Sequence, residues 1–574
     1  CCLPAAAALA AAPALRIERP MPPPAWALAE RALLEAYADA ARVFANKYLD
    51  DRGFLRCVER WGGNDGPDDA MENFHNWPLL YALGAPESVL ELYRKAWEGH
   101  LVQYTQARAP SIEMAKDGMY YKEFVTSFDW EHNGEGLAAF HFYALARPDD
   151  PVYRQRVRRF AGFYLNEDPE APNYDPQHKI IRSLHNGSRG PKLTPATERD
   201  WGGEPVPGRP ERLTRYSTAG NIRGDHPLNL CAATLPMNAY LLTGESKYRD
   251  WLLEYVGAWR ERIEANGGNI PTNIGLDGRI GGEWGGKWYG GVFGWNFWPQ
   301  ESGRNYYMRG PQIALGEALM LTGDERWISP LRRQIANLYA ARKMEKGRIL
   351  LPNKHGDQGW YGYTPDQHFD VQRDIYLWSM DRADLAWIVD DPWIGYLEGK
   401  NPDYPMTALQ ADFARIRQRV QGLRGDTSTP DTRSSDHPQR FNPVSITALV
   451  NLTLGGNDPG SSGNVLHSRV RYFDPARRRA GLPEDVAALV ERIQTEAVVL
   501  TLVNTNPIEA RTVVVQMGAY GEHHCLWVES SGRRVNIDAP FFAVRLAPGA
   551  GDTFTLGVKR YAHPPTAAFP WERE

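Results

Sequence analysis

The chain has 574 residues and a net charge of −5, with acidic and basic side chains interspersed along its length. A chain of this length has room for roughly two to four domains with large apolar cores. The weak negative charge without a basic cluster argues against a nucleic-acid-binding protein and against binding to an anionic membrane surface. Five cysteines without metal-ligand spacing, and odd in number, argue against a disulfide framework.

The first segment, CCLPAAAALAAAPALRIERP, is Ala-rich and apolar before it turns to Arg and Pro. It is too short to cross a bilayer but is typical of the remnant of an export signal. We therefore predict that residues 1–25 are such a remnant or a disordered tail. The predicted location is secreted, periplasmic or at a bacterial surface, where a lipid on Cys1 would be the anchor.

A turn motif recurs between predicted helices. The stretches AYLLTGESKYRDWL (239–252) and ALMLTGDERWISPL (318–331) both place Leu-Thr-Gly after an apolar helix end and an acidic residue before the next helix. The glycine can take the left-handed conformation that ends a helix, and the next acid or hydroxyl can cap the following one. The repetition predicts hairpins of one fully buried inner helix and one half-buried outer helix.

Six such hairpins are predicted, and we expect them to close into a ring over residues 26–455. The outer helices are expected at 26–47, 86–106, 150–166, 246–264, 325–343 and 404–423. The inner helices are expected at 74–83, 134–146, 227–243, 310–322, 368–390 and 441–453. The segment 370–389 is unusually polar for an inner helix.

The composition changes after about residue 456, where β-branched and aromatic runs alternate with Gly, Pro and Asn. The runs at 497–506, 510–522, 525–530 and 541–561 predict antiparallel strands of a β-sandwich over residues 456–574. The polar segment 474–486 is predicted to be a linker between the domains.

Six helical hairpins followed by a sandwich resemble the (α/α)6-toroid glycoside hydrolases and polysaccharide lyases. Within that group, the chain is most similar to enzymes that act on uronic-acid glycans, including glucuronidase-type hydrolases. The resemblance covers nearly the whole chain and implies a carbohydrate substrate, acidic sugars included, without a cofactor. It does not identify the bond that is cleaved.

The long predicted loops all lead from an outer helix to the next inner helix. They span 61–76, 107–136, 167–226, 265–309, 344–367 and 425–441. In an alternating ring these loops emerge on one face, where they would form a cleft. His75, His132, His226, His368 and His437 each fall at the end of such a loop or in the first turn of an inner helix. A histidine there meets the unfavourable end of the helix dipole, so we expect these side chains to converge on the ring axis.

The stretch FDWEHNGEG (128–136) has the densest group of acids and imidazole. Glycoside hydrolysis needs one carboxylic acid to protonate the leaving oxygen and a second carboxylate to activate water or attack. Glu131 and His132 are the first candidates; Asp129 and Glu135 are candidates that are also explained as a helix cap and a first-turn residue. The partner carboxylate is sought among Asp225, Glu283, Glu301, Asp69 and Glu72, with His226 beside Asp225.

The remaining candidates are predicted to hold the sugar. Tryptophan and tyrosine offer a flat face with a polar edge, which suits a pyranose ring, and arginine suits a carboxylate. The predicted substrate-binding residues are His75, Trp77, Trp130, His185, Asn186, Arg189, Arg223, Glu283, Trp284, Trp288, Tyr289, Trp295, Trp298, Arg309, Trp360 and His368. No HExxH or comparable spacing is present, so no metal is predicted.

Three alternatives to a hydrolase stay open. A polysaccharide lyase would use His185, Asn186 and Arg189 with a tyrosine from another loop, because β-elimination needs a group that neutralises the carboxylate and a base for the α-proton. A sugar epimerase would use paired histidines. A glycan-binding protein without catalysis would need only the aromatic surface.

Overall fold

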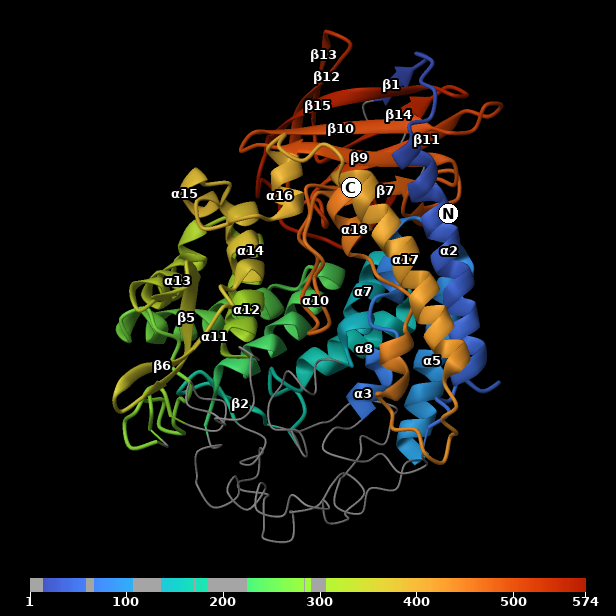
Figure 1. Cartoon of the computed structure of the whole chain (residues 1–574). Helices are drawn as coiled ribbons and strands as arrows, with labels where there is room; N and C mark the ends of the chain where they lie inside the picture. Colours follow the sequence, from blue (N-terminus) through green and yellow to red (C-terminus); the bar gives the residue numbers. More distant parts are fainter. Residues whose placement is uncertain are drawn as a thin grey trace.

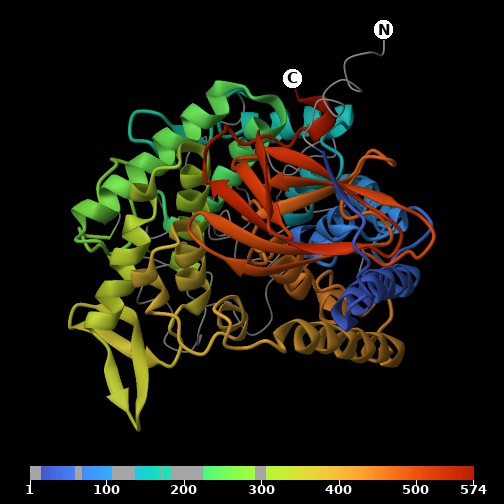
Figure 2. The same cartoon turned by 90° about the horizontal axis from the view of Figure 1, so that it is seen from above.

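The computed structural model describes residues 14–57, 67–106, 136–169, 172–182, 224–282, 284–290 and 306–573, with no side-chain description at 67–68, 104–106 and 306–307. Helices make up one part of the molecule and two sheets cover one end of it (Figure 1). Seen from above, the sheets lie across the helices (Figure 2). The chain therefore combines a helical domain with a β domain.

The helical domain contains the predicted outer and inner helices, most of them close to the predicted boundaries. The outer helices are α2 (Ala25–Tyr48), α5 (Glu87–Gln106), α8 (Pro151–Gly162), α11 (Ser246–Ala265), η3 (Glu325–Trp327) with α13 (Ser329–Ala340), and α17 (Tyr404–Gly425). The inner helices are α3 (Pro67–Glu72) with α4 (Trp77–Leu83), α7 (Ala138–Ala146), η2 (Pro227–Ala233) with α10 (Thr234–Thr243), α12 (Tyr306–Thr322), α14 (Phe369–Ser379), and η4 (His437–Phe441) with α18 (Thr447–Leu449) and η5 (Val450–Leu454).

The burial patterns explain why these segments form two layers. Every residue of α7 is buried, whereas α11 buries one stripe that includes Tyr248, Tyr255 and Trp259. Gly244 and Gly323 both have the left-handed conformation expected of the Leu-Thr-Gly turn, with φ of 70° and 67°. Asp324 caps the next helix through the backbone N–H of Arg326, while Glu245 makes no such bond.

One inner helix is shorter than predicted. The expected helix over 368–390 ends at Ser379, because Met380 takes a left-handed φ of 58° and Asp381 then caps a separate helix, α15 (Arg382–Leu385). The short helix α16 (Pro392–Leu397) precedes α17. The predicted loop 344–367 contains a three-stranded sheet of β4 (Lys343–Glu345), β5 (Arg348–Gly356) and β6 (Gly359–Thr364). Strands β2 (Tyr174–Asp175) and β3 (Ile180–Ile181) form a small hairpin.

The first and last hairpins of the helical domain lie against each other. Helix α2 packs on α17, and α4 packs on both α5 and α7. In the inner layer, Asn76 donates to the Val444 carbonyl at 3.0 Å and the Trp77 indole donates to the Asn442 side chain at 3.3 Å. Segments more than 300 residues apart are thereby joined.

The β domain has two five-stranded sheets within the described residues, in the orders β1-β14-β11-β7-β8 and β13-β12-β15-β10-β9. Their bounds are β1 (Ala14–Ile17), β7 (Val470–Asp474), β8 (Arg479–Ala480), β9 (Val486–Ile493), β10 (Ala497–Asn504), β11 (Arg511–Met517), β12 (His524–Ser530), β13 (Arg533–Ala539), β14 (Phe541–Leu546) and β15 (Gly551–Lys559). The predicted strands are present.

Two segments differ from the sequence prediction. Part of the predicted tail, Ala14–Ile17, pairs in parallel with β14 and so belongs to the β domain. The predicted linker 474–486 includes the end of β7, all of β8 and the start of β9, so it belongs to the sheets. Alternation of polar and apolar residues over such short strands was too weak to reveal them.

Arginines of the β domain, and one in the segment that leads to β7, bind the C-terminal ends of inner helices. Arg479 donates to the carbonyls of Tyr81 at 3.0 Å and Ala85 at 2.7 Å, at the end of α4. Arg471 binds the Leu145 carbonyl of α7, and Arg469 binds the Leu377 carbonyl of α14. The last carbonyls of a helix have no partner within it and carry the negative end of its dipole, so a guanidinium is the fitting cap.

The C-terminal end of α10 is bound by a backbone hydrogen bond from the β domain. The N–H of Ala567 donates to the Leu241 carbonyl at 2.8 Å, and Arg560 adds bonds to the last carbonyls of α14. Burial lowers the pKa of Arg471 to about 9, so this side chain, 1% exposed, stays charged at neutral pH. The two domains are therefore joined by directed hydrogen bonds as well as by apolar packing.

We expect the substitution Arg471→Met to lower the free energy of unfolding by about 2–4 kcal/mol, because the Leu145 carbonyl would be buried without its donor and the Ala519 carbonyl would keep only the Gln516 amide. Urea unfolding measures the change. Arg534→Met is the matched control: this arginine lies on the exposed side of the same domain, paired with Glu529, and its loss should matter by less than about 1 kcal/mol. Equal losses in both variants would contradict the role of Arg471.

Candidate functional site

A glycine-rich segment enters the helical domain between its last helix and the first strand that follows. Residues 455–469, GGNDPGSSGNVLHSR, form this segment, which we name the central loop; it runs from η5 down beside α10 and back to β7 (Figure 1). A Cβ at Gly456 would lie 2.3 Å from the carbonyl oxygen of His467, so only glycine lets the two limbs of the loop approach this closely.

Buried polar side chains hold the central loop in place. Asp458 accepts from the Thr447 hydroxyl at 2.6 Å and from the Gly460 N–H at 2.9 Å. On the other limb, Glu317 of α12 interacts with the backbone N–H of Val465 and accepts from the Thr234 hydroxyl at 2.6 Å. Burial raises the pKa of Glu317 to about 8, so this acid is protonated at neutral pH. The loop is thus fixed to α18 and α12, and Glu317 in turn links α12 to α10.

Asp374 is a carboxylate of α14 that is held between α12 and the central loop. Its oxygens accept from the Gln312 amide of α12 at 2.7 Å and from the Asn457 amide of the loop. Burial raises the pKa of Asp374 to about 6, although both amides act in the opposite direction. The side chain is half-buried. A carboxyl group in this state can hold or release a proton near neutral pH, which is what a general acid requires.

His75, between α3 and α4, is a second candidate with a defined protonation state. Its Nδ1 lies 2.9 Å from the Glu72 carbonyl oxygen. A carbonyl only accepts, so Nδ1 carries the hydrogen and Nε2 carries the lone pair. Burial lowers the pKa of His75, against the attraction of Asp458, so the ring is neutral at pH 7. A neutral imidazole with this tautomer can act as a base through Nε2.

The central loop contacts Asp374 directly, because the Asn457 amide donates to its carboxylate, and the next residue, Asp458, acts electrostatically to raise the pKa of His75. Arg309 of α12 is exposed and donates to the Ser462 hydroxyl on the same loop at 2.7 Å. Asp370 lies one helical turn before Asp374 and is exposed. The described residues around the central loop therefore include a carboxyl group with a raised pKa, a neutral imidazole, a cation and further carboxylates.

The sequence prediction included His75 and Arg309 but missed Asp374, Asn457 and Asp458. Two signals pointed to them. The segment 370–389 was noted as too polar for an inner helix, and Asp374 is one of its polar residues. The central loop follows a buried helix immediately with Gly-Gly-Asn-Asp-Pro-Gly, a run that makes a tight turn. Neither signal predicts that the segment 370–389 and the central loop contact each other.

Asp225 has a structural role in place of the predicted catalytic one. It is fully buried, and its oxygens accept from the Trp259 indole at 3.0 Å and the Tyr255 hydroxyl at 3.0 Å. The Asn229 amide and the backbone N–H groups of Ile181 and His226 are further donors. Burial raises the pKa of Asp225 to about 6. A carboxylate enclosed by these donors fastens η2 to α11 and has no side open to a substrate.

Three other predicted residues are buried. His226 is 3% exposed and precedes η2, and Trp77 is fully buried with its indole on Asn442. His368 is 4% exposed and precedes α14 with its backbone in the left-handed conformation. Its backbone N–H donates to the Asp366 carboxylate. A core position for Trp77 replaces the predicted contact with a sugar, because its ring packs edge-on against Phe44 and Phe74.

The predicted aromatic group is brought together in part. Trp288, Tyr289 and Trp360 surround the ring of His355 at centroid distances of 4.6, 4.7 and 4.8 Å, and all are half-buried. Trp284 packs against Gly290, where a side chain would collide with the indole. This cluster joins the 284–290 segment to the β5–β6 hairpin. Its role in binding a sugar stays a prediction.

The other predicted site residues lie outside the described part of the chain. They are Asp129, Trp130, Glu131, His132, Glu135, His185, Asn186, Arg189, Arg223, Glu283, Trp295 and Trp298. Within the described residues, no three His, Cys, Asp or Glu side chains are placed to hold a metal ion. The described helices also include none with the length and apolar character that crossing a membrane requires.

The family described as "Domain of unknown function (DUF8034)" matches residues 15–217, 205–348 and 387–450. The chain belongs to this family. His75 and Arg309 lie within the matched segments, whereas Asp374 and the central loop lie outside them. Among solved structures, a D-mannose isomerase is similar at 11% identity and a TM-score of 0.36, over 73% of this chain and 97% of that one. No curated protein matches the sequence.

We expect Asp374→Asn to stabilise the protein above pH 6. The native pKa of Asp374 lies above its ordinary value of 3.8, so its contribution to stability is fully present below pH 3.8 and is lost as the pH rises through about 6. The amide removes this penalty, which amounts to roughly 3 kcal/mol at most for a shift of about two pH units. Unfolding in urea at pH 4 and pH 8 measures the difference.

Asp150→Asn is the control of opposite sign. Asp150 caps α8 through the N–H groups of Val152 and Tyr153, and these bonds and the Tyr143 hydroxyl, outweighing burial, lower its pKa. Its contribution is present above its ordinary pKa and is lost as the pH falls. The substitution should therefore destabilise at pH 8. If Asp374→Asn also lost stability at pH 8, the conclusion that the ionised carboxylate of Asp374 destabilises the native protein would be refuted.

Proposed function

We propose that the protein is a carbohydrate-active enzyme, a glycoside hydrolase that acts on an oligosaccharide or polysaccharide, with a glucuronic-acid residue as the candidate sugar. The observation that supports hydrolysis most directly is the half-buried carboxyl group of Asp374 on α14, whose pKa burial raises to about 6. Hydrolysis of a glycosidic bond requires one carboxyl group that is protonated when the substrate is bound.

In this proposal Asp374 protonates the leaving oxygen, while Gln312 and Asn457 keep its carboxyl group oriented. A second group must then activate water or attack the sugar. Asp458, Asp370 and the lone pair of His75 are the described candidates, and Glu131 with His132, Asp129 and Glu135 remain the predicted ones. Arg309 suits a sugar carboxylate because a guanidinium matches it with two parallel N–H groups.

The architecture proposed for this function is a closed (α/α)6 toroid over residues 26–455 followed by a β-sandwich over 456–574. The packing of α2 on α17 supports closure. The β domain binds the C-terminal ends of α4, α7, α10 and α14, so the starts of these inner helices lie at the other end. That end is where the long loops and a substrate cleft are proposed. Export of the protein is part of the proposal as well.

A lyase or an epimerase is the second candidate, and the tautomer of His75 favours it. Both reactions need a base that removes a proton from carbon, and a neutral imidazole is such a base. A lyase would leave a conjugated double bond in the product, and an epimerase would leave the linkage intact. The products therefore separate these reactions from hydrolysis.

The test incubates the full-length protein with uronate-containing glycans and aryl glycosides. We expect saturated sugars to be released, with a rate that falls as the pH rises through about 6, because Asp374 loses its proton there. Asp374→Asn should reduce the rate about 100-fold or more, the usual contribution of a general acid. Product analysis by ultraviolet absorbance and mass spectrometry identifies the reaction.

Asp381→Asn is the control, because Asp381 follows α14 on the same segment but only caps α15 through the Ala383 N–H. Its activity should equal that of the wild type. An unsaturated product would replace hydrolysis with elimination. Release of sugar at the full rate by Asp374→Asn would remove Asp374 from the mechanism, and binding without turnover would indicate a glycan-binding protein.

A further inference from the structure

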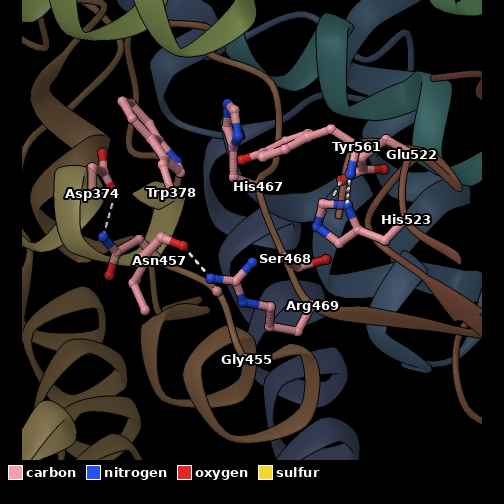
Figure 3. Close-up of a pocket in the computed structure, with 12 residues that line it drawn as sticks. Asp374, Trp378, Gly455, Asn457, His467, Ser468, Arg469, Glu522, His523 and Tyr561 are labelled. Carbon is pink, nitrogen blue, oxygen red and sulfur yellow. Dashed lines mark hydrogen bonds and ion pairs between the residues drawn. The ribbon is translucent and has the colours of Figure 1, made fainter. Parts of the chain in front are cut away.

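A small polar cavity lies directly behind Asp374, between the helical domain and the β domain. Its volume is about 20 Å³, which is enough for one water molecule. Asp374 and Trp378 line it from α14, and Glu522, His523 and Tyr561 line it from the β domain (Figure 3). The central loop supplies the remaining walls with Asn457, His467, Ser468 and Arg469.

The polar groups around the cavity are held in fixed orientations. The carboxylate of Glu522 accepts from the backbone N–H groups of Ala519 at 3.3 Å and Tyr520 at 2.8 Å. The Nδ1 of His523 accepts from the Tyr561 N–H at 3.1 Å, so the hydrogen of the neutral ring is on Nε2. Burial lowers the pKa of His523 well below its ordinary range, so the ring is neutral.

These walls meet the requirement for a buried water, which needs two to four polar partners in a space of its own size. An apolar cavity of this size would stay dry. Here hydroxyl, imidazole, guanidinium and carboxyl groups from three parts of the chain surround the space. Gly455, with φ of +63°, and Gly456 let the loop pack closely against Arg469 and Ser468, two residues of the cavity wall.

We propose that this cavity binds one water molecule that hydrates the carboxylate of Asp374 from the side of the β domain, and that the β domain thereby sets the proton affinity of the candidate acid. The inference rests on the role proposed for Asp374. A water that donates to the ionised carboxylate favours that form. Removing the water or one of its partners should therefore make Asp374 hold its proton more tightly.

Other titratable groups on the elements around Asp374 have to stay unchanged in the test. They are Asp370 and Arg373 on α14, His467 and Arg469 on the central loop, and Glu522, His523 and Tyr561 in the β domain. Substitutions that alter none of the formal charges are the appropriate ones. Ser468→Thr adds a single methyl group beside the cavity, and its hydroxyl can still donate to the Val470 carbonyl. Tyr561→Phe removes only a hydroxyl.

The experiment measures the native pKa of Asp374 without any substrate. Unfolding free energies are determined over a series of pH values for each protein with and without Asp374→Asn, and their difference gives the pKa by linkage. We expect Ser468→Thr to raise it by about 0.5 to 1 pH unit, and Tyr561→Phe to raise it by less. A crystal structure of the wild type should show one water in the cavity.

Tyr472→Phe is the matched control. Tyr472 is buried in the β domain and donates to the Thr453 carbonyl at 2.8 Å, where the domains also meet, but it does not line the cavity. It should lower stability and leave the pKa of Asp374 unchanged. An unchanged pKa in Tyr561→Phe, or a dry cavity in the crystal, would overturn the inference, and Tyr561→Phe decides the matter if Ser468→Thr does not fold. Loss of the proposed activity would be a separate result, because this pKa is measured by unfolding alone.

Discussion

The capping of inner-helix carbonyls by buried arginines is the constraint on which the arrangement of this protein depends. A helix that ends in the interior leaves carbonyl groups without partners, and these groups would oppose folding if nothing reached them. Arg479, Arg471 and Arg469 reach the ends of α4, α7 and α14. Each guanidinium is itself costly to bury, so it is stable only when the carbonyls are where the helices put them. The two domains therefore specify each other.

The position of the central loop also depends on these arginine caps. It leaves the last inner helix at Gly455 and returns at Arg469, whose side chain is one of the caps. Between these two points the loop places Asn457 on Asp374 and Ser462 on Arg309. A candidate acid on α14 is thus oriented by a segment that is anchored where the domains meet. This geometry explains how a β domain distant from the starts of the inner helices can still influence the centre of the helical domain.

Two buried aspartates show that a raised pKa by itself does not identify a functional group. Burial raises the pKa of Asp225 and of Asp374 to about 6. Asp225 is fully enclosed by indole, hydroxyl, amide and backbone donors, whereas Asp374 is half-buried and meets two amides and a polar cavity. Exposure and the set of partners separate the structural carboxylate from the candidate catalytic one. Sequence alone favoured Asp225, because it stands next to a histidine at the start of an inner helix.

The sequence by itself determined the elements, because helical and strand periodicity and turn chemistry act over a few residues. The Leu-Thr-Gly turns, the buried stripe of α11 and the strands β10, β11, β12, β14 and β15 were predictable. The early end of α14 at Met380 and the pairing of Ala14–Ile17 with β14 were not, since they depend on distant contacts. Tertiary structure alone decided that the central loop reaches Asp374 on α14 and Arg309 on α12. Their convergence depends on how helices far apart in the chain pack, and no local pattern records that packing.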